Sequence, residues 1–150
     1  KKIAPAVAKK APGKFIFHLV GKKLPPDLER LCVGNIKAEG FIESLAEFLN
    51  QMDIALVPSL LGAGMQQKIF EPLARGIPTV TSPRGLAGYP FRDKEHLLLA
   101  KTKDEFAEQI IRLQDVNLRR KLSANALTLC QQIFSRDKLD AIVQQGLNSL

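Results

Sequence analysis

A glycine-rich segment and a single carboxylate lie close together in the middle of this sequence. Gly62 and Gly64 follow an apolar run, and Glu71 lies about two turns into the helical pattern beyond them. Glycine lets a ligand approach the backbone, and the N-terminus of the next helix offers free N–H groups to a phosphate. A carboxylate can accept one hydrogen bond from each hydroxyl of a ribose. The pattern therefore indicates a site for a diphosphate and a ribose; the alternatives are an ordinary strand-to-helix turn and a solvated glutamate.

Two cations accompany this carboxylate in the sequence. Lys68 lies one turn before Glu71, so it could reach a phosphate or pair with Glu71 at the i, i+3 spacing. Arg84 follows an apolar run in a glycine-rich loop, where it could also contact a phosphate. The two histidines indicate no chemistry: His18 fits a core or strand-end position, and His96 lies in a charged loop that we expect at the surface.

The elements that must position these residues alternate between strands and helices. Short apolar runs predict strands at 14–20, 35–38, 53–57, 78–81 and 97–100. Helical periodicity predicts helices at 1–11, 25–32, 44–51, 66–75, 103–114, 116–132 and 136–149. This alternation predicts an α/β fold, with a Rossmann-like parallel sheet and helices on both faces. Ligands bind beyond the carboxyl ends of such strands, so the candidate loops are 21–24, 38–43, 58–65 and 82–90.

Composition limits the classes of protein that this chain can belong to. Its 150 residues fit one domain, and no apolar run approaches the roughly 20 residues that span a bilayer. The net charge of +7 favours anionic ligands or an anionic membrane surface. We expect no nucleic-acid partner, because basic and aromatic residues do not alternate. Cys32 and Cys130 are predicted to be buried, reduced thiols of a cytoplasmic protein, and no metal-ligand spacing is present.

A longer stretch resembles a known family. Residues 53–82, DIALVPSLLGAGMQQKIFEPLARGIPTVTS, resemble the C-terminal, donor-binding half of the GT-B glycosyltransferases of group 1, which are family 4-like enzymes. Residues 17–21 (FHLVG) are similar to the second strand of that half, with its trailing glycine. Residues 39–42 (EGFI) are similar to the turn behind the nucleotide base, and residues 85–88 (GLAG) to a loop after a later strand.

The resemblance implies roles for individual residues. The family holds the donor with two glutamates in a Glu-x7-Glu motif; Glu71 matches the second, which binds the ribose, and Ala63 stands at the first. Gly64, Met65 and Gln66 match the stretch whose backbone amides meet the sugar and the diphosphate. The residues expected to bind the donor are Gly40, Phe41, Gly62, Gly64, Met65, Gln66, Lys68, Glu71 and Arg84. No catalytic residue, metal ligand or cofactor is assigned to this lobe.

The implied activity is transfer of a hexosyl group, with retention, from a nucleoside-diphosphate sugar to a glycan or lipid-linked acceptor in polysaccharide biosynthesis. Residues 1–150 would then be one nucleotide-sugar-binding domain of a two-domain enzyme. The first strand of this half and the N-terminal acceptor domain are not in the sequence. We therefore expect a cytoplasmic protein that is inactive alone, with a charge that would suit the inner face of a membrane. The alternatives are a GT-B nucleotide-sugar epimerase and a non-catalytic module that has lost the donor site.

Overall fold

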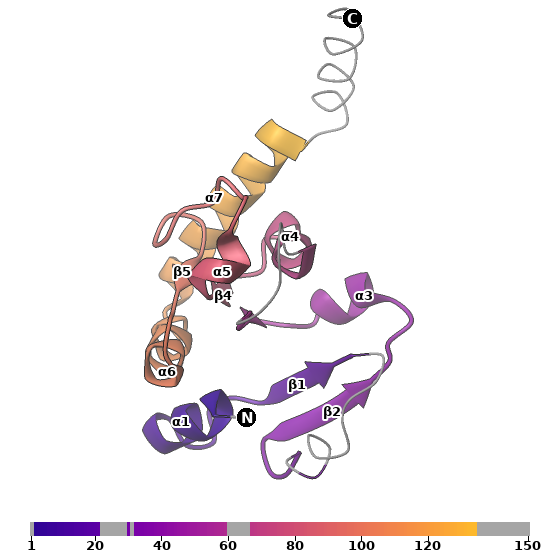
Figure 1. Cartoon of the computed structure of the whole chain (residues 1–150), viewed down its shortest axis with the longest axis vertical. Coiled ribbons are helices and arrows are strands. Elements are labelled where there is room, and N and C mark those ends of the chain that lie inside the picture. The colour runs from indigo at the N-terminus through magenta and orange to yellow at the C-terminus, as the bar shows by residue number, and fades with distance from the viewer. Residues whose placement is uncertain (1, 22–29, 31, 60–66, 135–150) are drawn as a thin grey trace, which may run out of the picture.

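The computed structural model describes residues 2–21, 30, 32–59 and 67–134, and these residues form two parallel sheets (Figure 1). In the first sheet, β1 (Phe17–Val20) pairs with β2 (Ile36–Gly40). In the second, β4 (Thr79–Thr81) lies between β3 (Ala55–Val57) and β5 (Leu98–Leu99). The predicted parallel α/β fold is confirmed. Among the described residues the strands form two hydrogen-bonded sheets, because β1 and β3 do not pair.

The helices begin and end where local signals place them. They are α1 (Ile3–Lys10), α3 (Leu45–Leu49), α4 (Gln67–Ala74), α5 (Pro83–Leu86), α6 (Lys103–Arg112) and α7 (Val116–Phe134). The Ser44 hydroxyl accepts the Glu47 N–H at the start of α3, and Thr102 caps α6 in the same way. Gly76 ends the α4 segment with φ +69°, a conformation that favours glycine. No helix among the described residues is long and apolar enough to cross a bilayer.

One short helix was not predicted. α5 occupies part of the expected loop 82–90, and its start carries two ordinary signals. The Ser82 hydroxyl accepts the Gly85 N–H, and Pro83 stands in the first turn, where its missing N–H costs nothing. Two predicted helices, 25–32 and 136–149, lie largely or wholly outside the described residues.

Two apolar clusters hold the helices against the strands. The first joins α1, α6 and the start of α7 to the strands; its fully buried members include Val7, Val80, Leu98 and Leu122. The second joins α4 to the middle of α7 and includes Ile69, Leu73, Leu97, Ala126 and Cys130. Since α7 contributes to both clusters, it connects the two halves of the core.

The two cysteines lie in different environments. Cys130 is buried in the second cluster, and burial raises the pKa of its thiol. Cys32 is only half-buried, so the prediction of two buried thiols holds for Cys130 alone.

We expect Cys130 to remain protonated at neutral pH, because a thiolate would lose solvation in this apolar cluster. Mass spectrometry after brief alkylation should therefore show little label on Cys130 in native buffer and full label in denaturant. Cys32 serves as the internal reference for reagent activity. Rapid native labelling of Cys130 would contradict the burial described here.

Candidate functional site

Buried hydroxyl groups tie together the carboxyl ends of the neighbouring strands β3 and β4. The Thr81 hydroxyl, at the end of β4, donates to the carbonyl oxygen of Val57, at the end of β3, across 2.9 Å. The Ser82 hydroxyl donates to the carbonyl oxygen of Ser59 and also accepts the Gly85 N–H at 3.2 Å. The first residues after β3 and the start of α5 are therefore held in a fixed arrangement at this edge.

Glu71 lies on α4, the helix that follows β3. Its side chain is 41% exposed, and one of its carboxylate oxygens, Oε1, accepts from Arg75. Arg75 approaches that oxygen with Nε at 2.9 Å and Nη2 at 2.8 Å. Both of these contacts are made to Oε1, and among the described residues no donor to the second oxygen, Oε2, accompanies them.

The partner of Glu71 differs from the expected one. The sequence allowed an i, i+3 pair with Lys68, but the structure pairs Glu71 with Arg75 at i, i+4. Lys68 is exposed, and no carboxylate in the described part of the chain lies within ion-pair distance of it. An exposed i, i+4 pair contributes only about 0.3–0.5 kcal/mol. The Glu71 carboxylate is thus oriented by Arg75 without being buried with it.

The first sheet ends at the predicted turn. Gly40 is the last residue of β2 and has φ +66°. Its carbonyl oxygen accepts the Gly21 N–H at 2.9 Å, which joins the exits of β1 and β2. The Phe41 side chain that follows is 65% exposed. An exposed aromatic ring beside a glycine turn offers a face on which a planar base could stack.

Of the other residues predicted to bind the donor, some are described by the structure and some are not. Arg84 is exposed on α5, which begins beside the ends of β3 and β4. Gly62, Gly64, Met65 and Gln66, together with Ala63, lie outside the described residues, so their predicted contacts stay predictions. The described part of the site therefore consists of α4, α5 and the exits of the strands.

A histidine–carboxylate pair next to Gly40 was missed by the sequence reasoning. His18 Nδ1 on β1 lies 2.6 Å from Glu39 Oε1 on β2, and the His18 ring meets the edge of Phe48 at 5.9 Å. Both side chains are partly exposed. No local signal could have found this pair, because it depends on the β1–β2 register, which sets His18 against Lys37 and Leu19 against Ala38.

Aromatic packing fixes α4 against the segment after α5. The Tyr89 ring stacks on Phe70 at 6.2 Å and lies 5.8 Å from Phe91. Partial burial raises the pKa of the Tyr89 phenol. Tyr89 therefore packs between α4 and its own segment of the chain. Because Phe70 directly precedes Glu71, the stack also limits how far that part of α4 can move.

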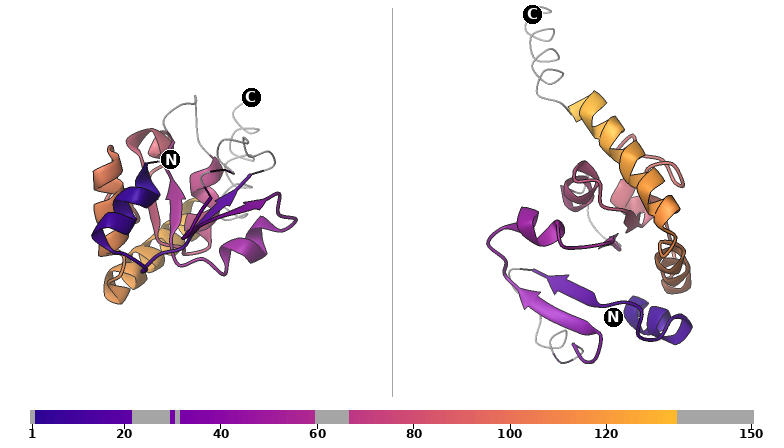
Figure 2. Two further views of the ribbon diagram at one scale, coloured as in Figure 1. Left: turned by 90° about the horizontal axis from the view of Figure 1, so that it is seen from below. Right: turned by 180° about the vertical axis from the view of Figure 1, so that it is seen from behind.

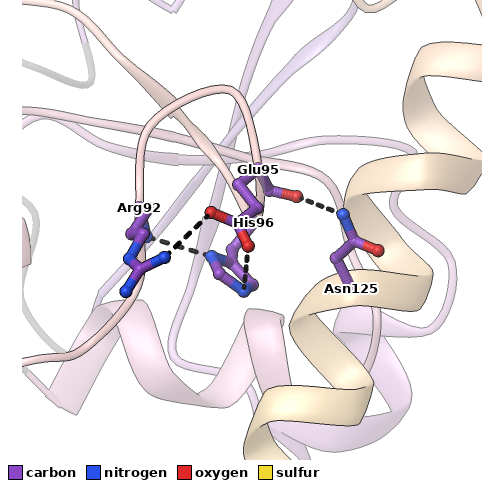
Figure 3. Close-up of polar contacts among 4 residues, drawn as sticks. All are labelled: Arg92, Glu95, His96 and Asn125. Atoms are coloured by element: carbon purple, nitrogen blue, oxygen red, sulfur yellow. Dashed lines mark hydrogen bonds and ion pairs between the residues drawn. The ribbon is translucent and has the colours of Figure 1, made fainter.

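His96 is buried, with 7% of its surface exposed, so the prediction of a surface histidine is wrong. Figure 3 shows the reason: the chain folds back on itself, and the Arg92 N–H donates to His96 Nδ1 at 3.1 Å. A neutral ring must then carry its proton on Nε2, which faces Glu95 at 3.8 Å. Asn125 of α7 donates to the Glu95 carbonyl oxygen at 2.8 Å. The cluster locks residues 92–96 onto α7 and serves a structural role.

Comparison with known families gives a match over most of the chain. Residues 1–115 match the family described as "Glycosyl transferases group 1". Comparison with curated proteins finds no match.

Solved structures share the fold at low sequence identity. The C-terminal domain of a glycosyl transferase group 1 family protein, LpcC, from Francisella tularensis has a TM-score of 0.75 and 21% identity, over 90% of this chain and 77% of its own. HepE from Anabaena, in complex with UDP, has a TM-score of 0.84 and 20% identity, over 99% of this chain and 44% of its own. Sucrose-phosphate synthase from Thermosynechococcus elongatus has a TM-score of 0.77 and 23% identity, over 100% of this chain and 43% of its own. The chain thus spans less than half the length of the last two proteins.

Proposed function

Because this chain belongs to the group 1 glycosyl transferases, we propose that it is the donor-binding domain of a retaining glycosyltransferase. The donor would be a nucleoside-diphosphate sugar and the acceptor a glycan or a lipid-linked sugar, in polysaccharide biosynthesis. The observation that carries the proposal is the placement of Glu71 on α4, with one carboxylate oxygen held by Arg75; the other would accept from a ribose hydroxyl. Relatives of the same fold support it, since HepE was solved with UDP and with UDP-glucose.

The chemistry follows from where charge develops during transfer. Breaking the bond between sugar and phosphate places negative charge on the leaving nucleoside diphosphate, while the sugar becomes oxocarbenium-like. Cations that meet the leaving group stabilise this charge without a nucleophile from this domain. Lys68 on α4 and Arg84 on α5 are the exposed cations of the described site. Phe41, beside the Gly40 turn, would stack on the base.

The proposal assigns only part of the enzyme to this chain. The acceptor would bind to a further, N-terminal domain, and transfer would take place between the two. We also propose a cytoplasmic enzyme that contacts an anionic membrane at its periphery, which the net charge of +7 supports.

Calorimetric titration with UDP, GDP and ADP tests the donor site. Saturable binding of one of them would support the proposal and identify the base. If neither these 150 residues nor the protein as it occurs in the cell binds any nucleotide, the proposal fails.

The purified 150-residue chain should show no transferase activity, because it would supply only one side of a site that forms between two domains. Radiolabelled UDP-, GDP- and ADP-sugars with lipid and glycan acceptors would measure this. Measurable turnover by the chain alone would refute the expectation, whatever the titrations give.

A non-catalytic module is the second candidate, and a specific observation favours it. Ala63 stands where the family has the glutamate that contacts the donor sugar. Such a module would bind no nucleotide, whereas an epimerase or a transferase would. The same titration therefore separates this candidate from the enzymes.

A further inference from the structure

The net positive charge of this chain equals the charge of its first 26 residues. Residues 1–26 contain seven lysines and no acidic residue, whereas the rest of the chain contains 15 basic and 15 acidic side chains. The excess of +7 over the whole chain therefore equals the number of lysines in residues 1–26, a stretch that includes α1 and β1. Such an asymmetry marks one region of the domain as the place where an anionic partner would bind.

Some of these lysines line a groove between α1 and α6. Lys2 and Lys9 of the α1 region and Lys103 of α6 line a groove of about 660 Å³, together with Lys10 and Asp104. Lys10 is paired with Glu108 at 2.8 Å. No carboxylate within the described ranges lies within ion-pair distance of Lys2, Lys9 or Lys103. Three lysines of the groove are therefore in no ion pair with a described carboxylate, and the groove lining holds more lysines than carboxylates.

Two exposed aliphatic side chains lie shortly before the strands of the first sheet. Ile16 is 60% exposed and Val33 is 69% exposed. Asn35 joins their segments, because its side chain donates to the Phe15 carbonyl oxygen at 3.0 Å and its own carbonyl accepts the Phe17 N–H at 2.7 Å. The strands β1 and β2 both start on the side of their sheet where α1 lies (Figure 1 and Figure 2). Lysines and exposed aliphatic side chains thus occur at the same end of the domain.

We propose that this end of the domain, formed by Lys2, Lys9, Lys103, Ile16 and Val33 and called the basic surface below, binds the headgroups of an anionic lipid bilayer. This proposal rests on the membrane contact proposed above and assigns it to the basic surface. It does not depend on the donor site. Lysine is a flexible point charge on a long apolar stem, which suits diffuse lipid phosphates. Ile16 and Val33 could enter the boundary between headgroups and acyl chains. The surface offers no aromatic ring on which a nucleic-acid base could stack.

The contribution of each lysine to lipid binding sets the size of the expected effect. One lysine near an anionic leaflet changes the binding constant about fivefold, so three changed together should weaken binding about a hundredfold. This attraction falls off within a Debye length, so added salt should release the protein. Replacing Ile16 and Val33 should also weaken binding, because it removes an apolar contribution that salt does not screen.

Vesicle sedimentation with the 150-residue chain tests the proposal. The probes are phosphatidylcholine vesicles with and without roughly one third phosphatidylserine, at low and high salt. We expect binding to the anionic vesicles only, lost at high salt and reduced about a hundredfold in Lys2→Gln/Lys9→Gln/Lys103→Gln. Ile16→Ser/Val33→Ser should also bind more weakly. Circular dichroism would verify that each variant is folded.

A matched variant removes three charges elsewhere. Lys37→Gln/Arg120→Gln/Lys121→Gln changes exposed cations on β2 and α7 and should sediment with vesicles as the unmodified chain does. Equal losses in the two triple variants would show a general charge effect and overturn the assignment. Absence of vesicle binding by the unmodified chain would also overturn it, including the case in which heparin binds and lipid does not. Nucleotide titration of the same samples reports on the donor site separately.

Discussion

Replacing Glu71 by alanine should weaken nucleotide binding by about 1–3 kcal/mol, which is a rise in Kd of roughly 5- to 150-fold. The physical reason is the loss of the carboxylate oxygen that would accept a ribose hydroxyl. The fold should hardly change, because Glu71 is 41% exposed and its pair with Arg75 is a surface ion pair. Calorimetric titration with the nucleotide that the unmodified chain binds measures the effect, and urea unfolding measures the stability.

The ribose itself supplies the sharpest control for this prediction. The unmodified chain should bind the 2′,3′-dideoxy form of the nucleotide more weakly than the natural form, and Glu71→Ala should bind the two equally. Glu108→Ala removes another exposed helical glutamate with a cationic partner, Lys10, and should leave the Kd unchanged. If Glu71→Ala still discriminates fully between the two nucleotides, Glu71 does not hold the ribose.

Replacing Gly85 by alanine should lower the stability of the domain by about 2–4 kcal/mol, or roughly 5–10 °C in Tm. A Cβ built on Gly85 would lie 2.2 Å from the Thr81 hydroxyl oxygen and 3.4 Å from the Val57 carbonyl oxygen. Thr81 is fully buried and donates to that carbonyl. The variant must either rotate Thr81, which leaves the Val57 oxygen without its donor, or displace α5 from the Ser82 cap. Thermal unfolding followed by circular dichroism measures the loss.

A second substitution separates crowding from other causes. Thr81→Ala removes the blocking hydroxyl, so Gly85→Ala should cost clearly less in that background than in the unmodified chain. Gly34→Ala is the comparison for a glycine that is not crowded: nothing lies within 4 Å of its Cβ position, and only its φ of +64° opposes the change. The prediction is contradicted if Gly85→Ala leaves the Tm unchanged. It is also contradicted if Gly85→Ala lowers the stability equally with and without Thr81→Ala, since the close approach of Gly85 to Thr81 would then not contribute to stability.

Several local features of this protein could be predicted from neighbouring residues alone. The apolar runs gave the order of strands and helices, and Gly76 marked the end of α4. The block at residues 53–82 indicated the family, which the match over residues 1–115 confirms. The start of α5 carried signals of the same local kind in Ser82 and Pro83 and could have been found.

Features that depend on how distant segments meet could not be predicted. His18 acquires Glu39 as a partner only through the β1–β2 register, and His96 is buried only because its loop folds onto α7. Glu71 could pair with Lys68 or Arg75 by spacing, and the side-chain geometry of the folded helix favours Arg75. The groove between α1 and α6 likewise unites lysines that lie far apart in the sequence.

The division has a physical cause. Periodicity, capping and glycine conformation act over a few residues, so the amino-acid sequence by itself determined the α/β class, the approximate positions of most elements and the family-matching block around Glu71. Burial, strand register and ion pairing between elements depend on which surfaces the core brings into contact. Only the tertiary structure therefore decided that Thr81 and Ser82 tie the strand ends together, that His96 is enclosed, and that the lysines in no ion pair with a described carboxylate lie at one end of the domain.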